Sequence, residues 1–224
     1  MQKAILPQII ITLLFAGVYV EAFNPATDLF TIARLKYAGG GDWYNDPSAV
    51  PNLMAFLRQE TNIPVAEDEV KVEIGSEELF SYPFVYMTGH GNIRLTDDEA
   101  LRLRIHLQHG GFLYADDDYG MDGAFRREIR KVFPKNDLVE LPPSHGIFHC
   151  YFDFPNGLPK IHEHDGKPPV AYGMFHQGRL VVLYTYETNI SDGWVDPDVH
   201  KDPPEKRIAA LRMGTNIVVW ALTH

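Results

Sequence analysis

The chain has 224 residues, of which 45% are hydrophobic, and it carries a formal net charge of −10 at pH 7. This length and apolar content predict a single domain with a sizeable core. The acidic excess excludes nucleic-acid binding as the main function, because that affinity comes from clustered Lys and Arg, and the sequence has no such cluster.

Residues 1–22 differ in composition from the rest of the chain. A positive start precedes the apolar run 5–20, and Val20 and Ala22 are small residues at the two positions that a signal peptidase inspects. We therefore expect a signal peptide over 1–22, export to the periplasm or the exterior, and one domain over 23–224. The alternative is an uncleaved anchor, but the run is shorter than the roughly 20 residues that cross a bilayer, and it contains a proline. No stable membrane span is expected after cleavage.

Apolar periodicity predicts alternating strands and helices in the first part of the chain. Thr96 and Glu99 have the spacing of a capping box, which marks a helix start, and Pro51 suits a first helical turn. Strands are expected over 29–37, 70–74, within 83–92 and over 112–115, and helices over 51–61, 96–109 and 122–132.

The second part of the chain begins with a proline-rich stretch, 134–169, which predicts loops with one short strand near 138–141. Residues 170–175 and 179–184 read as a hairpin, and 205–222 read as a closing helix. Strand–helix–strand units joined by short glycine turns are typical of parallel sheets. The sequence therefore predicts an α/β fold with a mainly parallel sheet.

Cys150 is the only cysteine, so an internal disulfide is impossible. Its neighbours Phe148, Tyr151 and Phe152 are apolar, which favours a buried, inert thiol over a nucleophile. The stability of the exported protein must then come from its core.

Three consecutive carboxylates, Asp116, Asp117 and Asp118, follow the apolar run 112–115. Ligands of open α/β sheets bind beyond the carboxyl ends of the strands, so these acids are candidates for a site. We expect them at a partly wet rim, because burial of adjacent like charges is costly. In an extended chain Asp116 and Asp118 share one direction and Asp117 faces the other way. The alternative is a purely structural role in capping and turn formation.

His90 lies between two glycines at the end of another predicted strand, where a tight turn allows a ligand to approach closely. We take Asp117, Asp118 and His90 as candidate catalytic residues. Aromatic faces beside carboxylates suit sugars but also suit ordinary packing. The candidate ligand-binding residues, drawn from the same turns and from the later SDGW segment, are Gly40, Gly41, Asp42, Trp43, Tyr44, Gly89, Gly91, Asp116, Tyr119 and Trp194.

Two histidine pairs raise the question of a metal. His162 and His164 in HEHD can face one side of an extended segment, and His145 and His149 are four residues apart. For both pairs a loop held by hydrogen bonds is the favoured reading, although HEHD would suit a cation; the metal and any other cofactor stay unknown. A GxSxG serine elbow and the lysine of a phosphate-binding loop are both absent from the sequence.

A family resemblance rests on segments spread over most of the chain. YAGGGDWYNDP, YPFVYMTGHGNIRL, HGGFLYADDDYGMD, ELPPSHGIF, LPKIHEHDG and LRMGTNIVVWALT resemble, in order, the bacterial family "domain of unknown function 4159". The resemblance implies a flavodoxin-like, three-layer fold similar to the class I glutamine amidotransferases and kinship with the ThuA-like proteins linked to sugar utilisation. The turn that would hold the amidotransferase cysteine here contains Asp116 to Asp118, so thioester chemistry is not expected. TGHG resembles the loop that forms the oxyanion hole.

Three functions follow as hypotheses. The first is an exported enzyme that acts on a small polar, carbohydrate-like ligand, with Asp117 or Asp118 as general base or metal ligand and His90 as acid or electrostatic stabiliser. The second is a non-catalytic binding or interaction domain of the cell envelope. The third is a metal-dependent hydrolase or a metal carrier. The sequence specifies neither the substrate nor the oligomeric state.

Overall fold

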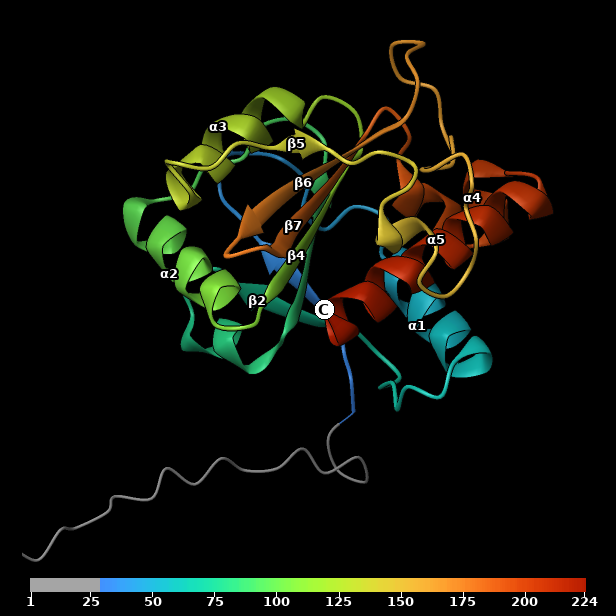
Figure 1. The fold of residues 1–224 in the computed structure, drawn as a ribbon, viewed down its shortest axis with the longest axis horizontal. Coiled ribbons are helices and arrows are strands. Elements are labelled where there is room, and N and C mark those ends of the chain that lie inside the picture. Colours follow the sequence, from blue (N-terminus) through green and yellow to red (C-terminus); the bar gives the residue numbers. More distant parts are fainter. Residues whose placement is uncertain (1–28) are drawn as a thin grey trace, which may run out of the picture.

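The computed structural model describes residues 29–224, so the predicted signal peptide lies outside the described residues (Figure 1). Strands and helices alternate as predicted up to residue 132. In chain order the elements are β1 (Ala33–Lys36), α1 (Ala49–Glu60), β2 (Val70–Glu73), the 3₁₀ turn η1 (Glu77–Ser81), β3 (Phe84–Gly89), α2 (Asp97–Gln108), β4 (Phe112–Asp117), α3 (Asp122–Val132), β5 (Val139–Glu140), η2 (Gly146–Phe148), β6 (Val170–His176), β7 (Arg179–Tyr186), η3 (Ile190–Trp194), α4 (Pro197–His200) and α5 (Pro204–Thr223).

The strands form one seven-stranded sheet in the order β2-β1-β3-β4-β7-β6-β5. The first five strands in this order run parallel, while β6 and β5 continue the edge in antiparallel pairing. The predicted hairpin is β6–β7, and the short strand expected near 138–141 is β5. The prediction of an α/β fold with a mainly parallel sheet is confirmed.

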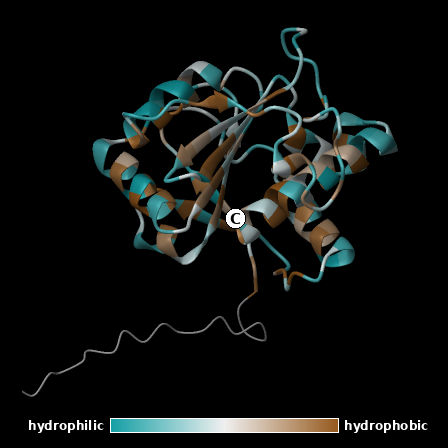
Figure 2. Ribbon diagram, in the orientation of Figure 1, coloured by the Kyte–Doolittle hydropathy of each residue, from teal (hydrophilic) through white to brown (hydrophobic). Residues whose placement is uncertain are grey.

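Helices cover both faces of the sheet, which gives three layers. Figure 1 shows α2 and α3 on one side and α1 and α5 on the other. Alternate side chains of one strand enter the two cores: Tyr114 packs on the α1/α5 side and Leu113 on the α2/α3 side. Figure 2 shows the hydrophobic colour concentrated along the strands and the hydrophilic colour on outward helix surfaces. Burial on both faces explains the continuous apolar runs of the sequence.

Local signals fix several element boundaries. The Thr96 side chain accepts from the Glu99 backbone N–H, and the Glu99 carboxylate accepts from the Thr96 N–H, so the predicted capping box is present. The first strand is shorter than predicted, because regular pairing covers only β1 and Phe30 forms an isolated bridge to Val65. β4, in contrast, is longer than predicted and continues through Asp117.

The chain reverses its direction of travel across the sheet between β1 and β3. From β1 it crosses to β2 at one edge, and from β3 onward it builds the sheet in the other direction. The loops after these two strands therefore diverge to opposite faces, which leaves a crevice at their carboxyl ends. The loop after β1 carries Asp42, Asn45 and Asp46, and the turn after β3 carries His90.

Cys150 has the environment expected from its neighbours. The thiol is half-buried and donates to the Asn216 carbonyl at 3.3 Å, and burial raises its pKa to about 11. A thiol in this state is a poor nucleophile at neutral pH. Within residues 29–224, no helix combines the length and the apolar character that a membrane crossing requires.

His106 on α2 generates a prediction about acid stability. Its side chain is buried, its Nε2 has no partner among the described residues, and burial, with Arg179 nearby, lowers its pKa to about 4. The unfolded chain binds this proton near pH 6.5 and the folded chain does not. The free energy of unfolding therefore decreases as pH falls from about 6.5 to 4, because of this group, by about 1.4 kcal/mol per pH unit.

The test is the free energy of unfolding in urea, measured at several pH values in that window. As pH falls, this free energy should decrease less for His106→Leu than for the parent protein. The matched control is His109→Leu, which removes an exposed imidazole one turn away and should keep the parent's slope. Equal slopes for His106→Leu and the parent would contradict the assignment.

Candidate functional site at the carboxyl ends of the strands

The three carboxylates at the end of β4 are buried. Asp116, Asp117 and Asp118 are 0%, 1% and 4% exposed. The prediction of a partly wet rim is wrong, because loops from distant parts of the chain close over this strand end and donate hydrogen bonds to Asp116 and Asp118, while the turn into α3 donates to Asp117. The prediction that successive acids face opposite sides is confirmed, since they contact different partners.

Asp116 has structural partners. Its carboxylate accepts from the Thr185 hydroxyl on β7 and from the Ser191 N–H of η3 at 2.6 Å. Burial raises its pKa, and these donors act in the opposite direction. Tyr114 also contacts Thr185, at 3.0 Å between the hydroxyl oxygens. Asp116 thus ties β4 to β7 and to η3.

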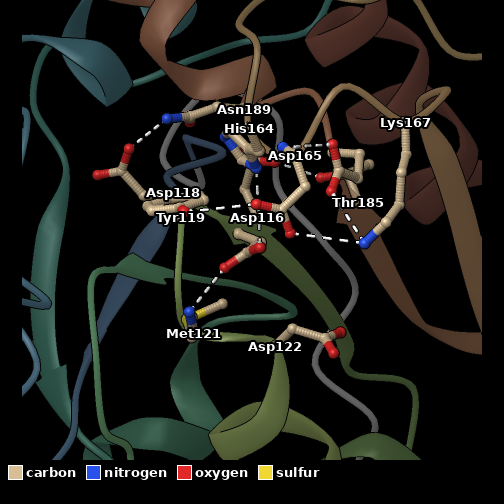
Figure 3. Close-up of polar contacts among 12 residues, drawn as sticks. Asp116, Asp118, Tyr119, Met121, Asp122, His164, Asp165, Lys167, Thr185 and Asn189 are labelled. Carbon is tan, nitrogen blue, oxygen red and sulfur yellow. Dashed lines mark hydrogen bonds and ion pairs between the residues drawn. The ribbon is translucent and has the colours of Figure 1, made fainter.

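Asp117 points to the other face of the sheet. Its Oδ1 accepts from the Met121 N–H at 2.8 Å and so fixes the turn into α3, while its Oδ2 lies 3.9 Å from Nδ1 of His164. These two partners, Met121 and His164, are labelled in Figure 3. Its pKa is raised to about 7, mainly by burial and with a smaller contribution from the charges of Asp116 and Asp122, while the hydrogen bond from Met121 acts in the opposite direction. Asp117 therefore links the start of α3 to a loop more than forty residues away.

Asp118 lies on the same side as Asp116 but nearer the surface. The side-chain amides of Asn45 and Asn189 donate to its two oxygens, and Nδ1 of His90 lies 3.4 Å from Oδ2. Burial raises its pKa, and the neighbouring His90 lowers it. Asp118 is thus the meeting point of the loops after β1, β3 and β7.

His90 is clamped by Asp42 across the crevice between β1 and β3. One Asp42 oxygen accepts from the His90 backbone N–H at 2.5 Å, and the other lies 3.1 Å from the ring Nδ1. Burial alone would raise the pKa of Asp42, but these bonds hold it below its ordinary range. A Cβ at Gly89 would collide with the Tyr37 hydroxyl, so the close approach of the turn after β3 to the loop that carries Asp42 requires glycine. The His90 N–H is engaged by Asp42 and is not free for an oxyanion.

The HEHD motif belongs to the histidine loop, which we define as residues 160–167. The ring of His162 bridges two carboxylates, with Nδ1 2.5 Å from Asp192 and Nε2 2.9 Å from Asp202. The hydrogen bond to Asp192 raises the pKa of His162 to about 9, and Asp202 adds to this. The His164 ring packs edge-on against Tyr119 at 5.3 Å. The loop is held by hydrogen bonds, as the favoured reading predicts, and it covers the strand ends.

The second histidine pair lies elsewhere and is also held by local contacts. Nδ1 of His149 is 2.5 Å from Asp153 and its Nε2 is 2.8 Å from the Pro143 carbonyl. His145 packs against Trp220 with 4.9 Å between ring centroids. This pair therefore has the structural role that the sequence favours.

Sequence reasoning missed several charged residues of the site. Oxygens of Asp46, Asp118 and Asp192 lie within 4.8 Å of one another, and so do the ligand atoms of His162, Asp192 and His200. Asp192 belongs to both groups. It lies in η3, directly after a turn in which Glu187 and Asn189 have φ of 63° and 50°. Such backbone conformations cluster at functional sites. In the sequence, the only sign of a site here is the SDGW segment that follows a predicted strand.

An open cavity of about 350 Å³ lies above this group. Its lining is polar and charged, and it includes two of the predicted catalytic residues, Asp118 and His90. The full lining is His90, Asp118, Tyr119, His162, Glu163, His164, Asn189 and Asp192. An adjoining cavity of about 240 Å³ is lined in part by Asp117 and His164.

The predicted aromatic residues divide into three environments. Tyr119 lines the cavity, but the prediction for Trp194 is wrong: its ring is 1% exposed, packs on Tyr86 and Tyr114, and donates to a backbone carbonyl of α5. Trp43 and Tyr44 pack against each other on the loop after β1, where Tyr44 is 62% exposed. Gly40, Gly41 and Gly91 belong to the turns beside the Asp42–His90 contact.

A larger groove of about 1040 Å³ lies at the opposite end of the sheet, where Phe30 and Pro83 precede β1 and β3. Its lining residues are apolar or uncharged, with Leu29, Ile63, Tyr151 and Leu222 among them. Among residues 29–224, the lining of the groove therefore contains no carboxylate, imidazole or amine. The chemistry of the described residues is concentrated at the carboxyl ends of the strands.

Fold and site together define an α/β protein with a charged cavity at the carboxyl ends of a mainly parallel sheet. The family model "domain of unknown function (DUF4159)" matches residues 31–222, and the chain belongs to this family. The match includes both strand-end turns and the histidine loop. A comparison with curated proteins finds no match.

The hydrogen bond from Thr185 to Asp116 yields a stability prediction. In Thr185→Val the buried carboxylate and the Tyr114 hydroxyl both lose a partner, so we expect a loss of about 1–3 kcal/mol in urea unfolding. The control is Thr215→Val, which removes an equally buried hydroxyl that contacts only a carbonyl of its own helix. Its cost should stay below about 1 kcal/mol. Equal costs would contradict the role assigned to Asp116.

Proposed function

We propose that this protein is a hydrolase of small polar substrates, with its active site in the cavity at the strand ends. The observation that carries the proposal is the Asp42–His90 pair at the mouth of that cavity, placed over the buried Asp118. A base held by a second group is the arrangement that general acid–base catalysis requires.

His90 is the proposed general base. Asp42 occupies Nδ1 and the backbone N–H, so the ring is fixed and Nε2 is the nitrogen left for a substrate or water; no partner for it is found within residues 29–224. In the ordinary catalytic arrangement the second group fixes the tautomer in this way. His90 is half exposed, which allows a reacting molecule to reach it.

Water is the proposed nucleophile. The lining contains no serine, threonine or cysteine, and Tyr119 is its only hydroxyl. In the proposed step, His90 takes a proton from water, the water oxygen bonds to the electrophilic centre, and the leaving group departs with a proton returned from the imidazolium. The products are those of hydrolysis, and no oxidant or second substrate is needed.

Asp118 is favoured over Asp117 as the assisting carboxylate. Asp118 shares a cavity with His90, whereas Asp117 holds the turn into α3 and faces the adjoining cavity. Asp118 would stabilise positive charge on His90 during the reaction. The acidic surroundings disfavour anionic substrates and favour neutral, hydroxyl-rich ones, which supports a carbohydrate-like ligand.

The finer fold assignment is also a proposal. The order β2-β1-β3-β4-β7 has the reversal between β1 and β3 that flavodoxin-like sheets show, with β6 and β5 as an added edge. This order supports a class I amidotransferase-like fold and kinship with the ThuA-like proteins. The DUF4159 domain would then use the same strand end without a cysteine.

Export and a single mature domain are proposed from the composition of residues 1–22. Residues 23–224 would be the mature protein, in the periplasm or outside the cell. The site described above lies entirely within this part of the chain.

A binding domain without catalysis is the second candidate. One observation favours it: every carboxylate on the turn that resembles the amidotransferase nucleophile position already accepts hydrogen bonds from protein groups. Such a domain would bind the same small polar ligand, and the exterior would be free to contact an envelope partner.

The proposal predicts which variants lose activity. On a panel of chromogenic esters and glycosides, we expect His90→Gln to lower kcat at least 100-fold, since general base catalysis contributes about 10²–10⁴-fold. Asp42→Asn should lower kcat less, because the base is retained but its tautomer is no longer fixed. Asp153→Asn, at the exposed His149–Asp153 pair, is the matched control and should keep full activity.

Full activity in His90→Gln would remove His90 from the mechanism. A panel compound that raises the melting temperature of the parent protein without being hydrolysed would instead support the binding domain.

A further inference from the structure

Four metal-ligand side chains from four segments of the chain converge on a fifth, Asp192 in η3. Asp46 comes from the loop after β1, Asp118 from the end of β4, His162 from the histidine loop and His200 from α4. Nε2 of His200 lies 3.6 Å from Asp192 and 3.9 Å from Asp46. These residues are far apart in sequence, so the fold assembles them.

The buried carboxylate at the centre lacks a donor on one oxygen. The Asp192 side chain is 6% exposed, and Oδ1 has no hydrogen-bond donor among the described residues. Oxygens of two other carboxylates, Asp46 and Asp118, lie within 4.8 Å of an Asp192 oxygen. A buried polar atom without a partner is rare in folded proteins, and carboxylates this close are stabilised by a shared proton or by a cation between them.

The ligand atoms are held in place by a second layer of hydrogen bonds. Asp202 accepts from Nε2 of His162, which orients Nδ1 toward Asp192, and Asn45 and Asn189 hold the two oxygens of Asp118. A carboxylate behind a histidine is a usual feature of metal sites, because it fixes the tautomer and the ring orientation.

We propose that Asp46, Asp118, Asp192, His162 and His200 form a binding site for a divalent first-row transition metal. Imidazole and carboxylate ligands together suit Zn²⁺ or Mn²⁺, whereas Ca²⁺ and Mg²⁺ prefer oxygen ligands alone. Asp192 is common to both ligand groups and is the central ligand. The site opens onto the cavity, which Asp118, Asp192 and His162 also line.

The metal site deepens the proposed hydrolase and rests on it only for its catalytic meaning. A divalent ion beside the cavity would activate water, the nucleophile that the proposed reaction needs. It would also offset the acidic charge of the cavity. Binding itself can be measured without any substrate.

The test is calorimetric titration of the full chain, stripped with chelator and dialysed, with ZnCl₂ and separately with MnCl₂. We expect saturable binding of at least one ion per chain by one of the two metals, a raised melting temperature with that metal, and no comparable effect of CaCl₂. Asp192→Asn should weaken binding at least 100-fold, and His200→Gln, at a part-exposed position, at least tenfold.

The matched control is Asp153→Asn, which alters an exposed carboxylate–imidazole pair away from the site and should bind as the parent does. No saturable binding by the parent, or parent-like binding by His200→Gln and Asp192→Asn, would overturn the metal site and leave a proton shared between Asp46 and Asp192. Binding lost equally in Asp153→Asn would indicate surface histidines and would also overturn it.

Metal binding and hydrolysis fail separately. If metal binds at this site but no panel compound is hydrolysed, the metal-site proposal stands and the hydrolase proposal is refuted. If hydrolysis persists after complete chelation and depends on His90, a catalytic role for the metal is refuted and the hydrolase proposal stands.

Discussion

Burial of three consecutive carboxylates at the end of a central strand is the constraint on which the rest of this structure depends. An unpaired buried charge costs several kcal/mol, so each of these acids must be met by donors. The donors come from everywhere except β4 itself: Thr185 and Ser191 serve Asp116, Met121 serves Asp117, and two asparagines serve Asp118. The loops that form the cavity are therefore the same loops that stabilise the strand end.

This arrangement divides the acids between structure and chemistry. Asp116 is fully buried and has protein donors on both oxygens, so it acts as a tie between β4, β7 and η3. Asp118, one step nearer the surface, has the same direction but meets His90 and the cavity. Because side chains two residues apart in an extended chain point the same way, Asp116 lies in the core and Asp118, in the same direction, lies at the site.

The sequence predicts the local structure well. The capping box at Thr96 and the continuous apolar runs are local signals, and they predict α2 and the parallel strands. Alternation also predicts the opposed directions of Asp116 and Asp117. Such features depend on residues close together in the chain, so no tertiary information is needed.

The composition of the site depends on long-range contacts and could not be predicted in the same way. Burial of Asp118 is decided by Asn45 and Asn189, which are 73 and 71 residues away. The sequence predicts Trp194 in a pocket, but α5 covers its ring. The residues next to SDGW in the sequence do not reveal this packing. Asp192 and His200 become candidates only when the fold brings them to Asp46.

The proposed metal ion would balance the charges of the carboxylates around Asp192. Anomalous diffraction at the zinc edge, from crystals grown with zinc, tests this most directly. We expect an anomalous peak at coordinating distance, about 2.0–2.2 Å, from an Asp192 oxygen. A well-ordered site without such a peak, with Asp46 and Asp192 in direct hydrogen-bond contact, would contradict it.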